Sequence, residues 1–231
     1  MQDGTARVRL RYHPRMEIYL DTADVAAWAG RPGWPSIAGA TTNPALLRQA
    51  GLETRLEDLK TLVEAAASRK LASLMLQLPR PLAREAVAWA DALLDSSAGR
   101  VSLTFKLPCQ PEWAPVVKAL KKLEARVLLT AIANPVQLLW ARDEGADFVA
   151  PYLGRLEAAG RSIWPLVDAC VAVQTRGGPA LLAASIRNED MLNGLIARGA
   201  AAATLNPALL EALSRDEFTE EAVAGFGGTS Q

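Results

Sequence analysis

Histidine is almost missing from this sequence: His13 is the only one among 231 residues. Ser-His-Asp and Cys-His catalysis need a positioned imidazole, and a histidine-rich metal site needs several. The sequence therefore argues against these three kinds of site. We expect any chemistry to depend on Lys, Asp, Glu, Tyr, Ser or Thr side chains instead.

Cysteine is scarce as well, and charge of one sign is not in excess. Cys109 and Cys170 lie far apart and match no metal or redox spacing, which favours a cytoplasmic protein in a reducing compartment. The 25 basic and 25 acidic side chains give a formal net charge of zero. Because nucleic-acid binding draws on a basic excess, we expect no nucleic-acid partner.

Long apolar runs are missing too. No stretch of eighteen apolar residues occurs, so we expect no membrane span. The first residues, MQDGTARVRLRYHPR, lack the apolar segment of a secretory signal. We expect residues 1–15 to form a disordered or optional extension, with a short transit peptide or a true start at Met16 as alternatives. Residues 16–231 would then form the folded domain.

Short apolar runs alternate with amphipathic stretches from Met16 onward. Apolar side chains recur at helical spacing over 56–66, 82–94 and 191–196, for example. The apolar runs, which we expect to be strands, are 17–20, 37–40, 72–77, 101–107, 126–130, 147–150, 179–185 and 201–205. Near-continuous apolar strands separated by helices indicate a parallel sheet. Eight such units in about 200 residues favour a single (β/α)8 TIM barrel over a doubly wound sheet.

A short sequence that occurs twice in the chain supports this count of strand–helix units. Residues 41–47 read TTNPALL and residues 204–210 read TLNPALL. In both, Asn suits the N-cap of a helix and Pro suits its first turn. Two similar junctions explain Asn206, whereas Asn43 would also lie at the barrel mouth.

Lys106 is the most unusual residue at a predicted strand end. It lies within VSLTFKLP, where a buried ammonium is costly to desolvate. Burial favours the neutral amine, which attacks carbonyl groups and forms a Schiff base. The alternative is a lysine whose ammonium extends into water.

Other polar residues follow the strands, where the active sites of such barrels gather. They are Asp21, Thr42, Asn43, Gln77, Thr130, Tyr152, Arg155, Ser185 and Arg187. Asp21 is a candidate for holding hydroxyls or moving protons, and Tyr152 for donating a proton. Arg155, Ser185 and Arg187 suit a phosphate group. Each also has a plain structural reading as a cap, a hydrogen-bonded core residue or a surface arginine.

Five motifs, in order, resemble the class I aldolases of the transaldolase family. They are YLDTADV, GATTNPALL, TFKLP, VAPYLGR and LAASIRN. The chain is most similar to the branch that contains the small fructose-6-phosphate aldolases and the transaldolase-C-like proteins. The resemblance runs from about Met16 to the C-terminus and implies a (β/α)8 barrel, a lysine Schiff base, no metal ion and no cofactor.

The resemblance also implies roles for individual residues. Lys106 matches the Schiff-base lysine, and Asp21 matches the acid on the first strand. Thr130 matches a threonine that helps hold the catalytic water. Thr42 and Asn43 match the substrate-contacting TTNP segment, and Arg155, Ser185 and Arg187 match the phosphate binders.

Two positions separate the branches of the resembled family. Gln77 and Tyr152 match the aldolase branch, whereas transaldolases usually have Glu and Phe there. Because Gln cannot take a proton, Tyr152 would carry the proton transfer. The segment TAIANPVQ is instead closer to the transaldolase-C pattern, and Arg187 replaces the Lys that is usual among aldolases.

These observations predict a class I aldolase that cleaves or forms a ketose phosphate such as fructose 6-phosphate. The first alternative is a transaldolase that moves a dihydroxyacetone unit between sugar phosphates. The second is a sugar-phosphate-binding barrel without catalysis. Relatives in the resembled family form decamers or pentamer pairs in which the C-terminal helix reaches a neighbouring subunit. We therefore expect a homo-oligomer with 218–226 as the candidate contact, and a helix packed on its own barrel is the alternative.

Overall fold

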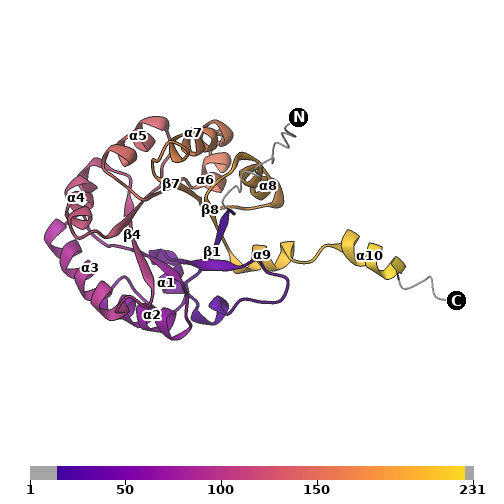
Figure 1. Cartoon of the computed structure of the whole chain (residues 1–231), viewed down its shortest axis with the longest axis horizontal. Coiled ribbons are helices and arrows are strands. Elements are labelled where there is room, and N and C mark those ends of the chain that lie inside the picture. The colour runs from indigo at the N-terminus through magenta and orange to yellow at the C-terminus, as the bar shows by residue number, and fades with distance from the viewer. Residues whose placement is uncertain (1–14, 227–231) are drawn as a thin grey trace, which may run out of the picture.

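The computed structural model describes residues 15–226 and shows a closed eight-stranded barrel (Figure 1). Its strands are β1 (Glu17–Asp21), β2 (Ile37–Thr41), β3 (Ser73–Gln77), β4 (Ser102–Pro108), β5 (Arg126–Thr130), β6 (Phe148–Ala150), β7 (Ala180–Ala183) and β8 (Ala202–Leu205). Neighbouring strands are parallel, and β8 closes the barrel onto β1. The predicted TIM barrel is confirmed, and every predicted apolar run overlaps one of its strands.

Helices surround the barrel and connect its strands (Figure 1). They are α1 (Pro44–Gln49), α2 (Leu56–Ser68), α3 (Ala83–Ser97), α4 (Ala114–Lys122), α5 (Pro135–Asp143), α6 (Leu153–Ala158), α7 (Trp164–Gln174), α8 (Glu189–Arg198) and α9 (Pro207–Leu213), with short 3₁₀ helices η1 (Val25–Trp28) and η2 (Pro111–Trp113). The apolar face of each long helix packs on the strands, as the helical spacing of leucine and alanine predicts.

The repeated Asn-Pro pairs begin helices, as their sequence predicts. The Asn43 side chain accepts hydrogen bonds from the backbone N–H groups of Ala45 and Leu46, at 2.9 and 3.0 Å. Asn206 accepts one from Ala208 at 2.8 Å. Proline follows each asparagine at the first helical position, where its missing N–H leaves no broken bond.

The core has two parts, one outside and one inside the ring of strands. A large apolar layer fills the space between strands and helices. A smaller cluster fills the barrel interior, and its buried members are Tyr19, Met75, Leu128, Phe148, Ala150, Leu182 and Ala202. Many of the side chains nearer the carboxyl ends of the strands are polar, and a cavity lies between them.

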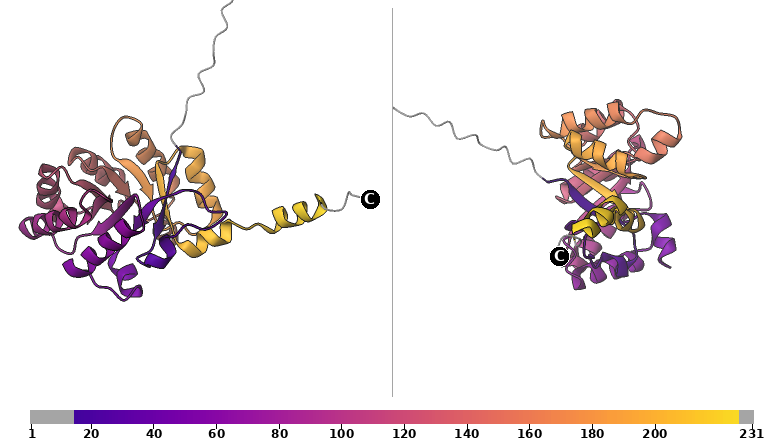
Figure 2. Two further views of the ribbon diagram at one scale, coloured as in Figure 1. Left: turned by 60° about the horizontal axis from the view of Figure 1, so that its bottom comes forward. Right: turned by 90° about the vertical axis from the view of Figure 1, so that its right-hand side faces the viewer.

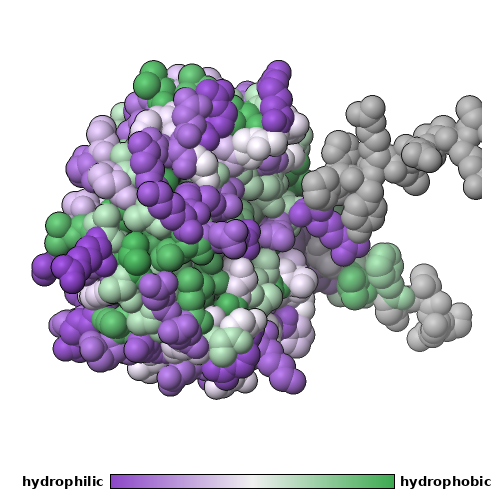
Figure 3. Space-filling view, turned by 60° about the vertical axis from the view of Figure 1, so that its left-hand side comes forward, coloured by the Kyte–Doolittle hydropathy of each residue, from purple (hydrophilic) through white to green (hydrophobic). Residues whose placement is uncertain are grey.

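A C-terminal helix, α10 (Glu217–Phe226), projects away from the barrel and has no buried residue (Figures 1 and 2). Phe218 and Phe226 are each about four-fifths exposed. Figure 3 shows apolar surface on this projecting part, beside a barrel wall of mixed polarity. The proposed extension, residues 1–15, lies outside the described residues except for Arg15. No helix within 15–226 is long and apolar enough to span a membrane.

Candidate active site

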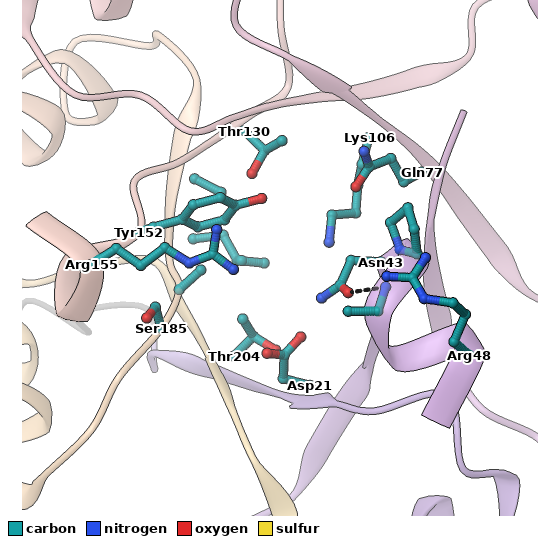
Figure 4. Close-up of a pocket in the computed structure, with 15 residues that line it drawn as sticks. Asp21, Asn43, Arg48, Gln77, Lys106, Thr130, Tyr152, Arg155, Ser185 and Thr204 are labelled. Carbon is teal, nitrogen blue, oxygen red and sulfur yellow. Dashed lines mark hydrogen bonds between the residues drawn. The ribbon is translucent and has the colours of Figure 1, made fainter. Parts of the chain in front are cut away.

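A cavity of about 400 Å³ opens at the carboxyl ends of the strands (Figure 4). Side chains from β1, β3, β4, β5 and β8 converge on it, together with α1, α6 and the segments after β6 and β7. Its lining residues are Asp21, Asn43, Pro44, Ala45, Arg48, Gln77, Lys106, Thr130, Ala150, Tyr152, Arg155, Leu182, Ala184, Ser185 and Thr204. Closure of the barrel thus brings together all the predicted site residues except Thr42 and Arg187.

Lys106 reaches the cavity from within the barrel wall. It pairs in register with Gln77 on the neighbouring strand, and its side chain is only 6% exposed. Its Nζ donates a hydrogen bond to the carbonyl oxygen of Thr42. Burial lowers the pKa of Lys106 to about 8, although the nearby Asp21 carboxylate opposes the shift. The structure therefore contradicts the alternative of an ammonium extended into water.

Asp21 lies at the end of β1 and is held by a chain of hydroxyl groups. The Thr41 hydroxyl donates to Asp21 Oδ1 at 2.9 Å, and Thr41 and Thr204 share a hydrogen bond of 2.7 Å. Burial raises the pKa of Asp21, while Lys106, the Thr41 hydrogen bond and Arg155 act in the opposite direction. A carboxyl group beside the reacting lysine, with its pKa raised by burial, is placed to exchange protons with substrate.

Thr130 supplies an unsatisfied hydroxyl to the cavity. Its Oγ1 is buried and has no hydrogen-bond partner within residues 15–226. The next residue, Ala131, has a φ of 63°, a left-handed conformation that non-glycine residues rarely adopt. Such strain tends to accumulate at functional sites. A water molecule or a substrate hydroxyl would satisfy the Thr130 side chain.

Tyr152, Arg155 and Ser185 form one side of the cavity. The guanidinium carbon of Arg155 lies 4.8 Å from the centre of the Tyr152 ring, which restrains both side chains. Ser185 has a φ of 60°, and its carbonyl oxygen accepts a hydrogen bond from the Gly154 N–H at 2.9 Å. A Cβ at Gly154 would overlap the Ser185 carbonyl oxygen, so this approach requires glycine.

Thr42 and Arg187 lie where the sequence did not lead us to expect them. The Thr42 hydroxyl is fully buried and donates to the Met75 carbonyl oxygen at 3.0 Å. Thr42 therefore holds Lys106 through its backbone rather than contacting substrate through its side chain. Arg187 is exposed, is absent from the cavity lining and packs beside Gly154.

Sequence reasoning missed Arg48, which lines the cavity from α1. It also missed Thr41, the partner of Asp21. The spacing of Arg48 could have predicted its position. Arg48 follows Pro44 by four residues, and residues four apart share a face of a helix. Since Pro44 adjoins the capping residue at the barrel mouth, Arg48 faces the same way.

Within the part of the chain that the structure describes, no group of three or more His, Cys, Asp or Glu side chains is arranged so that it could hold a metal ion. Cys109 and Cys170 are both buried, and burial raises the pKa of each thiol, to about 11 and about 12. The thiols are thus kept protonated and poorly reactive at neutral pH.

Comparison with known families agrees with this geometry. The family described as Transaldolase/Fructose-6-phosphate aldolase matches residues 18–229. The chain belongs to this family. It is therefore an enzyme of the transaldolase and sugar-phosphate aldolase group, with a TIM barrel fold, and the resemblance seen in the motifs is confirmed.

Individual members of the family are distant but similar over nearly their whole length. A probable transaldolase from Oceanobacillus iheyensis is 27% identical over 215 residues, covering 91% of this chain and 96% of the relative. A probable transaldolase from Kosmotoga olearia is 28% identical, covering 91% and 94%. A solved thiamine phosphate pyrophosphorylase from Pyrococcus furiosus has a TM-score of 0.55 at 15% identity, covering 86% of this chain and 89% of that one, and shows a shared fold alone.

Proposed function

We propose that this family member is a Schiff-base transaldolase that moves a dihydroxyacetone unit between sugar phosphates. The observation that carries the proposal is Lys106, a buried lysine with a lowered pKa at the wall of a polar cavity. A neutral amine there is a nucleophile for the ketone carbon of a ketose. The relatives named as transaldolases favour transfer over simple cleavage, which reverses the order of the two activities expected from the motifs.

The first half of the reaction forms the Schiff base. Lys106 Nζ attacks the ketone carbon of the donor, and the carbinolamine loses water to leave an iminium ion. Asp21 is the carboxyl group whose charge acts on the pKa of the reacting nitrogen, so it supplies and removes the protons. The free Thr130 hydroxyl holds the water that leaves and later returns.

The second half breaks and remakes a carbon–carbon bond. The bond between the third and fourth carbons breaks, its electron pair passes to the iminium nitrogen, and the fourth carbon leaves as an aldehyde once its hydroxyl proton is removed. A three-carbon enamine stays on Lys106. In transfer the enamine carbon attacks the carbonyl carbon of a second aldehyde, whose oxygen takes a proton, and water hydrolyses the new iminium ion to release the longer ketose and free Lys106. In simple cleavage the enamine carbon takes a proton instead, and water releases dihydroxyacetone. Arg155 and Ser185 would bind the phosphate of the aldehyde fragment.

The second candidate is the aldolase, which Gln77 and Tyr152 favour. Both side chains line the cavity beside Lys106, and Gln77 is its neighbour in register on β3. A phenol near the enamine can deliver the proton that ends the cycle by release of dihydroxyacetone, whereas a neutral amide cannot.

Borohydride reduction tests the shared chemistry of both candidates. Full-length protein incubated with fructose 6-phosphate and borohydride should gain the mass of one reduced three-carbon adduct, and peptide mapping should place it on Lys106. Lys106→Met should gain none, and Lys118→Met, on the exposed face of α4, should react like the wild type. If the protein bound the sugar phosphate but formed no adduct, it would be a sugar-phosphate-binding barrel without catalysis.

Product analysis then separates transfer from cleavage. With erythrose 4-phosphate present, a transaldolase should form the seven-carbon ketose phosphate much faster than it releases dihydroxyacetone. Release of dihydroxyacetone at an equal or greater rate, with or without the acceptor, would assign the aldolase.

A further inference from the structure

We infer that Arg48 forms a second oxyanion subsite, which binds a phosphate ester or carboxylate on the donor fragment that stays attached to Lys106. This inference rests on the proposed Schiff-base chemistry of Lys106 and goes beyond the proposed transfer reaction in one respect: the donor fragment carries an oxyanion where dihydroxyacetone has a neutral hydroxyl group. Three cationic side chains line the cavity, from Arg48, Lys106 and Arg155, against the single carboxylate of Asp21. The chain as a whole has a formal net charge of zero, so positive charge is concentrated here.

The topology places the two arginines on opposite sides of the barrel mouth. Arg48 belongs to the helix after β2, and Arg155 to the helix after β6. In a closed barrel ordered β1 to β8, strands two and six are four steps apart in both directions. Lys106, on β4, lies midway between them, and Figure 4 shows the two guanidinium groups facing the cavity from opposite sides. The cavity therefore presents a guanidinium group on each of two sides.

The surroundings of Arg48 leave its guanidinium available. It makes no ion pair and no side-chain hydrogen bond to any residue within 15–226. Some exposed arginines, such as Arg31 and Arg142, pair with acidic neighbours, whereas Arg48 combines a guanidinium that is unpaired in the described part of the chain with a place in the cavity lining. A guanidinium that lines a cavity without a protein carboxylate suits an oxyanion of the substrate.

Asn43 adds a second donor on the same side. Its side-chain oxygen accepts hydrogen bonds from two backbone N–H groups, which fixes the orientation of the amide. The Nδ2 group is therefore the part of Asn43 that can donate to a ligand in the cavity. Together the amide and the guanidinium offer several N–H donors to one oxyanion, while Arg155 and Ser185 serve the aldehyde fragment.

Borohydride trapping with three-carbon ketones tests the inference. The probes are dihydroxyacetone, which is neutral, dihydroxyacetone phosphate and hydroxypyruvate. For each, the concentration that gives half-maximal trapping on Lys106 is measured with the full-length protein. We expect at least one anionic probe to trap at about tenfold lower concentration than dihydroxyacetone, as a charge-assisted hydrogen bond can supply. Whichever anion gains the advantage identifies the oxyanion.

Variants assign that advantage to one side of the cavity. The ratio between anionic and neutral probes should fall to about one in Arg48→Gln, be partly kept in Arg48→Lys, and stay unchanged in Arg69→Gln, an exposed arginine at the end of α2. An equal ratio for all probes in the wild type, or an advantage that survives Arg48→Gln and disappears in Arg155→Gln, would overturn the inference. No trapping of any probe would instead refute the Schiff-base function itself.

Discussion

At the scale of single residues, Lys106 shows how burial becomes reactivity. Lys106 lies between Phe105 and Leu107 on its strand, and folding of the barrel removes its amine from bulk water. The penalty on the charged form lowers its pKa, and Asp21 limits the shift because its negative charge favours the ammonium. The same pair of groups therefore sets both the supply of neutral amine and the transfer of protons.

The buried lysine should reduce stability in a pH-dependent way. Its pKa is about 8 in the folded protein against an ordinary value of 10.5 for an exposed lysine, which we take for the unfolded chain. The unfolded chain therefore binds more protons between these two values, and wild-type stability rises with pH across that window. Lys106→Met removes this penalty. The variant should be more stable by up to about 3 kcal/mol below pH 8, with the difference shrinking toward pH 10.5.

Urea unfolding of both proteins from about pH 7 to pH 10.5 measures this difference. Lys118→Met is the control for the loss of a lysine side chain, since Lys118 is exposed on the surface of α4. A Lys106→Met protein that is less stable than the wild type at neutral pH would contradict the prediction.

Tyr152 should decide how the enamine is released. Tyr152→Phe removes the phenolic proton and keeps the ring under Arg155, so dihydroxyacetone release should fall by roughly 10²–10⁴-fold, the usual contribution of general acid–base catalysis. Transfer to erythrose 4-phosphate should fall less, because that step does not protonate the enamine carbon.

The double change Gln77→Glu with Tyr152→Phe should shift the ratio of products further toward transfer, since a carboxylate would then lie next to Lys106. The ratio of seven-carbon product to dihydroxyacetone is measured for each variant. If Tyr152→Phe lowers both reactions equally, the phenol has no separate role in release.

The two arginines near Ser185 should differ in importance. Arg155 lines the cavity, whereas Arg187 is exposed and absent from the lining. Arg155→Ala should raise the Michaelis constant for glyceraldehyde 3-phosphate by about tenfold or more, as loss of a charge-assisted contact would. Arg187→Ala should raise it by a smaller factor.

Unphosphorylated glyceraldehyde is the matched control substrate for this comparison, because it has no group for either arginine to bind. Equal losses with both aldehydes would mean that Arg155 acts by supporting Tyr152 rather than by binding phosphate.

At the scale of elements, the two Asn-Pro junctions share their chemistry and differ in their location. Both asparagines cap a helix that follows a barrel strand, and both prolines occupy the first helical position. Only Asn43 lines the cavity, whereas Asn206 is exposed outside it. The capping interaction is local, so it repeats; contact with the cavity depends on where the barrel places each junction.

This pair allows stability to be separated from activity. Asn43→Ala and Asn206→Ala should each lower the free energy of unfolding by about 1 kcal/mol, because each loses a helix cap. Asn43→Ala should in addition lower the rate of trapping on Lys106, and Asn206→Ala should not. Chemical unfolding and borohydride trapping of both variants provide the two measurements. Equal trapping rates in the two variants would remove Asn43 from the substrate site.

At the scale of the whole molecule, α10 is the element that the barrel itself does not explain. It projects from the barrel and leaves three large apolar side chains exposed, those of Phe218, Val223 and Phe226. Several large apolar side chains exposed on one helix are typical of an interaction surface. We propose that α10 packs on a second copy of this chain, in a homo-oligomer of the size expected from the resemblance, a decamer.

Shortening the chain tests the role of α10. A protein that ends at Arg215 should elute as a smaller species than the full-length chain in size-exclusion chromatography with light scattering, and its barrel should keep its circular dichroism spectrum. Phe218→Ser with Phe226→Ser should act in the same direction. An unchanged molar mass for both would show that α10 makes no contact between copies.

The sequence was enough to predict the barrel and most of the residues that line its cavity, because both depend on local patterns. Continuous apolar runs mark strands buried on both faces, asparagine and proline mark helix starts, and a lysine such as Lys106 is conspicuous in an apolar strand. The polar residues at the strand ends then gather at one face, because all the strands run the same way.

Which side of each junction faces the cavity depends on the packing of the whole barrel. This packing directs Thr41 to Asp21 and turns the Thr42 hydroxyl to a neighbouring strand, and it places Arg155 in the lining with Arg187 outside it. Neighbouring residues in one segment point in different directions, and the twist and closure of the barrel select between them. Arg48 joined the site for the same reason, since only the closed barrel sets its helix opposite Arg155.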